Sequence, residues 1–122
     1  VPAGRLYVDG GVVTPENGEA LRERRHAAFN GMLAVSIVLD GRNKIVSGPQ
    51  VRGIGLTGDE EYSLDDALDD LAEEAETAYK RLDGDAREVD ETIESAISRA
   101  VKKAAFRIWE RKPVVETTVL RI

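Results

Sequence analysis

The sequence predicts an α+β domain: a small three-stranded sheet with two long antiparallel amphipathic helices packed on one face, plus a short N-terminal helix. Two apolar stripes repeat every three to four residues between positions 64 and 108, which is the period of a helix. Three β-rich stretches lie before and after these stripes. Three strands are too few to close a barrel, so a sheet covered by both helices buries the apolar residues most economically.

Local patterns order the first half of the domain. Residues 19–29 favour a short helix, which an Asn-Gly pair would end. Residues 32–40 predict a strand, and 40–43 a tight turn. Residues 44–47 predict the returning strand of a hairpin, interrupted by a Gly-Pro pair and continued over 51–56 after a bend or bulge.

Capping signals and apolar spacing place the two long helices. Ser63 is a good N-cap, and the helix that follows should bury Leu64, Leu68, Leu71, Ala75, Tyr79 and Leu82. The next helix begins between positions 85 and 90, ends before Pro113, and should bury Val89, Ile93, Ile97, Ala100, Val101, Ala104 and Ile108. The alternating, β-branched stretch 114–122 predicts the last strand.

Composition limits the function classes. The 122 residues suit one domain over 19–122, with 1–18 as a connecting segment from preceding domains. The chain starts without methionine, so we expect it to be part of a longer protein. No cysteine and one histidine, His26, exclude thiolate chemistry and multi-histidine metal sites within it. No apolar run is long enough for a membrane span. We therefore expect no catalytic, metal or cofactor-binding residues here.

Charge is divided along the chain, although the formal net charge is only -6. Residues 59–94 hold sixteen acidic and three basic residues, whereas 99–112 hold six basic residues and one acidic residue. The acidic side of the first long helix is expected to be a solvated face, the alternatives being a docking face for a basic partner or an imitation of nucleic-acid charge. Residues 53–58 spell G-x-G-x-x-G, but three acidic residues follow before any helix begins, so a flexible strand end is the favoured interpretation.

Basic and aromatic residues alternate on the second long helix, roughly opposite its aliphatic stripe. Such a pattern can hold a nucleic-acid backbone and stack bases. The favoured interpretation is packing of Phe106 and Trp109 under another element or across a subunit interface, where aromatic residues are enriched. The candidate RNA or subunit contacts are Arg99, Lys102, Lys103, Phe106, Arg107 and Trp109.

The order and spacing of several short motifs, from about residue 6 to 122, resemble the C-terminal domain of ribonuclease J. These motifs are Leu21-Arg22-Glu23-Arg24-Arg25 with Asn30-Gly31, Lys44-Ile45-Val46-Ser47-Gly48-Pro49 with Arg52-Gly53, and Arg111-Lys112-Pro113 before the last strand. The segment between Pro49 and Arg52 is shorter than is usual in that family, and the acidic run after Gly58 is heavier. Contacts made by that loop are therefore not carried over.

The resemblance implies a bacterial, cytoplasmic RNA-processing enzyme whose preceding metallo-β-lactamase and β-CASP domains bind zinc and act as a 5′-to-3′ exonuclease and endonuclease. It implies for this domain a non-catalytic role in assembly into dimers or tetramers and in RNA positioning. The expected partners are its own catalytic domains, further copies of the chain, and RNA through the parent enzyme, with no membrane. A self-standing acidic adaptor that binds a basic protein is the alternative.

Overall fold

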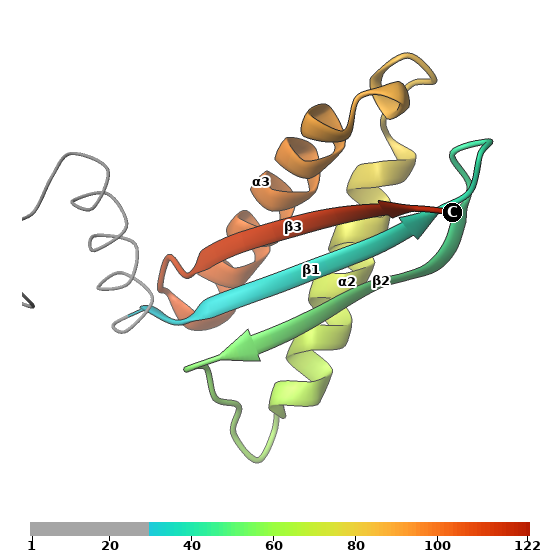
Figure 1. Ribbon diagram of the computed structural model, residues 1–122. Coiled ribbons are helices and arrows are strands. Elements are labelled where there is room, and N and C mark those ends of the chain that lie inside the picture. Colours follow the sequence, from blue (N-terminus) through green and yellow to red (C-terminus); the bar gives the residue numbers. More distant parts are fainter. Residues whose placement is uncertain (1–29) are drawn as a thin grey trace, which may run out of the picture.

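The computed structural model describes residues 30–122, and the helix expected over 19–29 lies outside them. The elements are β1 (Met32–Leu39), β2 (Ile45–Ile54), α2 (Leu64–Lys80), the short 3₁₀ helix η1 (Ala86–Glu88), α3 (Asp90–Trp109) and β3 (Val114–Arg121) (Figure 1). Every strand and long helix expected over this part of the sequence is present.

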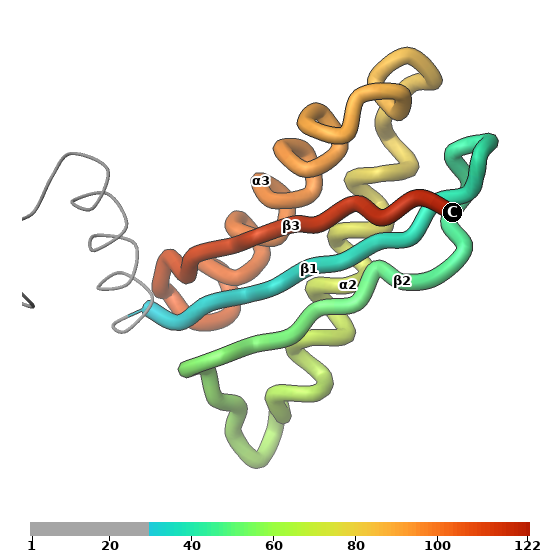
Figure 2. The backbone as a smooth tube through the Cα atoms, in the orientation of Figure 1, coloured from blue at the N-terminus to red at the C-terminus, as the bar shows by residue number. Residues whose placement is uncertain are grey.

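The three strands form one mixed sheet in the order β2-β1-β3. The hairpin partner β2 runs antiparallel to β1, whereas β3 runs parallel to β1 (Figure 2). Helices α2 and α3 cover the same face of the sheet and run in opposite directions (Figure 1). The predicted α+β class, with three strands and two helices packed on one face, is therefore confirmed.

The predicted irregularity in the second strand is a bulge around Gly48. The pairing between β1 and β2 shifts register between Ser36 and Val38, opposite this glycine. Gly48 has φ +81°, and a Cβ atom built there would lie 2.8 Å from the carbonyl oxygen of Ser36. A side chain at this position would meet both a backbone penalty and a clash, so only glycine suits the bulge.

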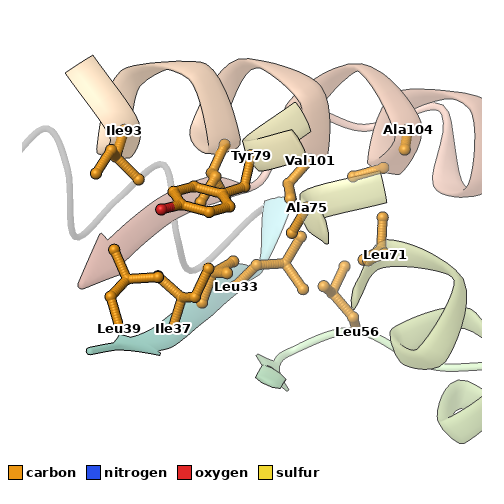
Figure 3. Close-up of a cluster of buried hydrophobic side chains, with 13 residues drawn as sticks. Leu33, Ile37, Leu39, Leu56, Leu71, Ala75, Tyr79, Ile93, Val101 and Ala104 are labelled. Atoms are coloured by element: carbon orange, nitrogen blue, oxygen red, sulfur yellow. The ribbon is translucent and has the colours of Figure 1, made fainter. Parts of the chain in front are cut away.

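The core lies between the sheet and the two helices. Strand β1 contributes the four alternating residues Leu33, Val35, Ile37 and Leu39, each at most 1% exposed. Figure 3 shows several of these side chains meeting residues of both helices. The buried residues on the helices are Ala67, Leu71, Ala75 and Tyr79 of α2, and Ile93, Ile97, Val101, Ala104 and Ala105 of α3.

Three details of the helices differ from or refine the sequence prediction. The Ser63 cap is confirmed, because its hydroxyl accepts a 3.1 Å hydrogen bond from the Asp66 N–H. The burial predicted for Val89 is wrong: Val89 precedes the first turn of α3 and is 49% exposed. Ala67 and Ala105 are buried although the predicted stripes omitted them. Their small side chains allow helices and sheet to approach closely, which spacing alone does not reveal.

Arg121 links four segments at the end of the domain where β3 finishes. Its Nε donates to Asp90 Oδ1 at 2.9 Å, and its Nη1 donates to Asn43 Oδ1 at 2.6 Å. Its Nη2 donates to the carbonyl oxygen of Arg87 at 2.9 Å. The last strand is thereby joined to the hairpin turn, to η1 and to the start of α3.

Candidate functional site

A groove of about 670 Å³ runs between the C-terminal half of α3 and the beginning of the edge strand β3. Its apolar walls come from the aromatic ring of Phe106, which is 48% exposed, and from the segment that enters β3. Three lysines supply its positive charge. The lining residues are Lys102, Lys103, Phe106, Lys112, Pro113, Val114, Val115 and Glu116.

A second, more polar groove of about 790 Å³ continues along the same seam toward the start of α3. Lys102, Val115 and Glu116 line both grooves, so the two form one continuous depression. Across the second groove, the hydroxyls of Ser98 and Thr117 are hydrogen bonded at 2.7 Å. The remaining lining residues are Glu91, Glu94, Ser95, Arg99 and Thr118. The seam is therefore basic near the end of α3 and acidic near its beginning.

The structure separates the six residues predicted as RNA or subunit contacts. Four of them, Arg99, Lys102, Lys103 and Phe106, line the seam between α3 and β3. Arg107 lies elsewhere: its Nη2 is 3.7 Å from the Glu74 carboxylate of α2. The six residues thus do not form a single surface.

Trp109 also departs from the common basic and aromatic face expected on α3. Its indole is partly buried against the core cluster, and its Nε1–H donates to the carbonyl oxygen of Thr57 at 2.8 Å. The ring therefore packs beside the loop between β2 and α2, as the interpretation of packing under another element anticipated. The expectation that it lies away from the core is wrong, because the loop after β2 meets this end of the helix.

Lys112 is the basic residue of the first groove that the sequence analysis did not place among the candidates. It belongs to the Arg111-Lys112-Pro113 motif, which the sequence analysis used for the family resemblance and, at Pro113, for the end of the second long helix. Pro113 is fully buried and begins the turn into β3, so the residue before it is held at the groove wall. A search for basic residues beside the strand start, rather than on the helix alone, would have found it.

The glycine-rich segment 53–58 does not form a phosphate cradle. The backbone N–H groups of Glu61 and Tyr62 already donate to the Asp59 carboxylate, at 2.9 and 2.8 Å. Helix α2 begins only at Leu64, whereas a dinucleotide motif needs the helix to open within the glycines. The interpretation as a strand end is confirmed.

The acidic face of α2 is exposed at most of its carboxylates. Two of the others take part in ion pairs, Glu76 with Lys80 at 3.0 Å and Glu74 with Arg107. Asp70 accepts a hydrogen bond from the Tyr62 hydroxyl, and burial together with this bond raises the pKa of Tyr62 to about 12. The Glu74–Arg107 pair joins α2 to α3, and the Tyr62–Asp70 bond joins α2 to the loop before it.

Within residues 30–122 no group of three or more His, Cys, Asp or Glu side chains is arranged to hold a metal ion. His26 lies outside this range. None of the helices in the same range is sufficiently long and apolar to span a membrane.

Comparison with known proteins gives one family and two similar relatives. Residues 19–122 match the ribonuclease J C-terminal domain. A ribonuclease J of Sinorhizobium meliloti is 32% identical over 123 residues, an alignment that covers 99% of this chain and 21% of the relative. A ribonuclease J of Corynebacterium glutamicum is 23% identical over 121 residues, covering 98% of this chain and 16% of the relative. The chain thus spans about a fifth or less of the length of these relatives.

Proposed function

The chain belongs to the ribonuclease J C-terminal domain family, and from this premise we propose that it is a non-catalytic accessory domain of a ribonuclease J-like RNA-degrading enzyme. In this role it supports self-association of the enzyme and helps to position RNA. Catalysis, with its zinc ions, would belong to the part of the enzyme that this chain does not span.

The observation that carries the RNA role is the basic groove between α3 and β3. Lys102, Lys103 and Lys112 surround an exposed aromatic ring, Phe106, at one end of the seam. Lysines bind phosphates as point charges, and an exposed ring can stack with an unpaired base. A groove with both features suits a single-stranded nucleic acid better than a neutral ligand.

The opposite charges on the two helices set the expected strength of this binding. The exposed carboxylates of α2 repel phosphate, and the acidic end of the seam, with Glu91 and Glu94, restricts the favourable track to the end near Phe106. The domain should therefore bind RNA weakly by itself. Most of the affinity would come from the rest of the parent enzyme, and this groove would extend its RNA-binding surface.

The test is the salt dependence of RNA binding by the full-length enzyme that carries this domain. Charge reversal at Lys102 and Lys103 should weaken binding without sequence preference. It should also flatten the plot of log affinity against log salt, by roughly 0.7 per lost phosphate contact for single strands. Charge reversal at Arg42 and Lys44, in the exposed hairpin turn, makes the same change in net charge and serves as the control. An unchanged slope in the groove variant would assign this seam to protein packing.

A further inference from the structure

The sheet ends in two edge strands, β2 and β3, which differ in regularity. Strand β2 pairs with β1 through register shifts and carries Pro49, which has no N–H to donate. Strand β3 pairs with β1 over all eight of its residues without a shift. A regular edge strand presents a row of backbone groups to which a further strand can bind. None of the residues 30–122 pairs with the outer edge of β3 (Figure 2).

The backbone groups that point to this outer edge follow from the pairing on the other side. The N–H groups at the two ends of β3, those of Val114 and Ile122, donate to carbonyl oxygens on the β1 side. Backbone groups alternate in direction along a strand, so the even-numbered residues in between also point to β1. The N–H and C=O groups of Val115, Thr117 and Val119 therefore point to the outer edge.

The seam between α3 and β3 runs along the same edge, and the helix and the strand run in opposite directions (Figure 1). The hydrogen bond between the hydroxyls of Ser98 and Thr117 fixes one level of the helix against one level of the strand. Two residues of a strand advance about 6.6 Å, and four residues of a helix advance about 6 Å. Val115 is therefore level with Lys102, and the later half of β3 is level with Glu94.

The charge of the seam changes along this edge. Lys102 and Lys103 line the part beside the start of β3, where the ring of Phe106 adds apolar surface. Glu91 and Glu94 line the part farther along the strand. A chain of phosphates would be attracted at one end of the seam and repelled at the other. A peptide can carry acidic and basic side chains in the complementary order, and its main chain can bind the outward backbone groups of β3.

We infer that an extended peptide of another protein binds in the seam as a fourth strand, antiparallel to β3. Its basic residue lies beside the glutamates of the seam, its acidic residue beside the lysines, and its C-terminal apolar residue against Phe106. Antiparallel pairing is slightly more stable per residue than parallel pairing. Side chains alternate along the peptide, so every second residue faces the seam. The inference goes beyond the RNA role and does not depend on it.

Fluorescence anisotropy of the 122-residue chain with a labelled peptide tests the inference. The test peptide is Lys-Thr-Thr-Thr-Asp-Thr-Leu, in which the lysine, the central charge-free position, the aspartate and the leucine face the seam. The reversed peptide, Asp-Thr-Thr-Thr-Lys-Thr-Leu, has the same composition and net charge. It should bind about tenfold more weakly, because both ion pairs become repulsions.

Methylation of single backbone nitrogens separates strand pairing from attraction by charge. The nitrogen of the third peptide residue, opposite Thr117, should donate to β3, so its methylation should weaken binding about fivefold. The nitrogen of the second residue points away from β3. Its methylation is the matched control and should leave the affinity of the test peptide unchanged.

Variants of the chain test the same contacts from the other side. Thr117→Pro removes an N–H at the outer edge without removing a bond to β1, and should weaken binding about tenfold. Thr117→Ala loses the hydroxyl bond to Ser98 but keeps the N–H, and should bind like wild type. The exchange Glu94→Lys/Lys102→Glu keeps the net charge and should make the reversed peptide the preferred one. Circular dichroism verifies that each variant is folded.

Several outcomes would overturn the inference. These are no detectable binding of the test peptide, equal affinity for the test and reversed peptides, and equal affinity for the two methylated peptides. If binding of the peptide dissociated a dimer in sedimentation, the edge would belong to a second copy of the chain, and the inference would again be wrong.

The peptide site and the RNA role fail in different ways. If the peptide site is wrong, charge order and methylation have no effect, while charge reversal at Lys102 and Lys103 still alters the salt dependence of RNA binding. If the RNA role is wrong, that salt dependence stays unchanged, while the chain still prefers the test peptide to the reversed one.

Discussion

The hydroxyl of Tyr79 donates a hydrogen bond to the backbone carbonyl oxygen of Asn43 at 2.5 Å. Tyr79 is 2% exposed and stands in the last turn of α2, whereas Asn43 is in the turn between β1 and β2 with φ 62°. The guanidinium of Arg87 lies 4.8 Å from the centre of the tyrosine ring. One side chain thus contributes to the core and holds the hairpin turn.

We expect Tyr79→Phe to lower the free energy of unfolding by about 1 kcal/mol, because the ring packing is kept while the Asn43 carbonyl loses its donor. Urea unfolding monitored by circular dichroism measures this change. The control is Tyr62→Phe, which removes a surface hydrogen bond to Asp70 and should cost less than about 0.5 kcal/mol. Equal losses of unfolding free energy in the two variants would show that the hydrogen bond to Asn43 stabilises the domain no more than the surface bond does.

Alkaline pH should destabilise the domain from about pH 10 upward. Burial raises the pKa of Tyr79 above its ordinary value of 10.0, and the pKa of Tyr62 is raised to about 12. The unfolded chain then releases these protons at lower pH than the folded chain does, so stability is complete below pH 10 and falls as pH rises toward 12. The double variant Tyr62→Phe/Tyr79→Phe should show a shallower fall in melting temperature between pH 9 and pH 11. If the melting temperatures of the wild type and the double variant fell equally with pH, this linkage would be contradicted.

Trp109→Ala should destabilise the fold by about 2 kcal/mol, because the partly buried indole packs on the core and holds the loop at Thr57. Trp109→Phe keeps most of the packing and should cost about 1 kcal/mol for the lost N–H bond. Phe106→Ala, at a more exposed ring, should have little effect on stability. Urea unfolding of the three variants provides the comparison. A Trp109→Ala chain as stable as wild type would indicate that the ring's main contacts lie outside the domain.

Replacing Glu110 by glycine should stabilise the domain by roughly 0.5–1 kcal/mol. Glu110 ends α3 in the left-handed region with φ 53°, where its N–H donates to the Phe106 carbonyl oxygen at 2.8 Å. Glycine adopts this conformation without the steric penalty of a Cβ atom. Thermal unfolding should show a rise of a few degrees, whereas Glu110→Ala should give no such gain. A lower melting temperature for the glycine variant would contradict the prediction.

The 122-residue chain should not cleave a 5′-monophosphorylated RNA in the presence of zinc, manganese or magnesium. Metal-assisted hydrolysis needs a set of converging ligands, and no such set occurs within residues 30–122. Incubation followed by gel analysis of the RNA is the measurement. Metal-dependent cleavage that co-purifies with the chain and disappears on substitution of Asp69 or Asp70 would refute the prediction.

The sequence predicted several individual residues of the candidate site, but it did not predict which of them lie together on one surface. Basic and aromatic residues on α3 pointed to Lys102, Lys103 and Phe106, which do line one groove. The same helical spacing grouped Arg107 and Trp109 with them. A helical wheel gives the angle of each side chain about its axis, but it does not tell which neighbouring element occupies that angle.

The sequence by itself determined the order and the approximate bounds of the strands and long helices over residues 30–122, because these depend on local physics. Apolar spacing specified the helices, the Ser63 hydroxyl began α2, and Pro113 set a limit that α3, which ends at Trp109, does not pass. Only the tertiary structure decided that β3 lies parallel to β1. As a result, Arg52 and Glu116 lie on either side of Ala34 in the sheet, and the Arg121 side chain reaches Asn43. Those relationships join residues 64 and 78 positions apart. They arise from burying both helices on one face of the sheet, a balance over the whole core that local residue patterns do not contain.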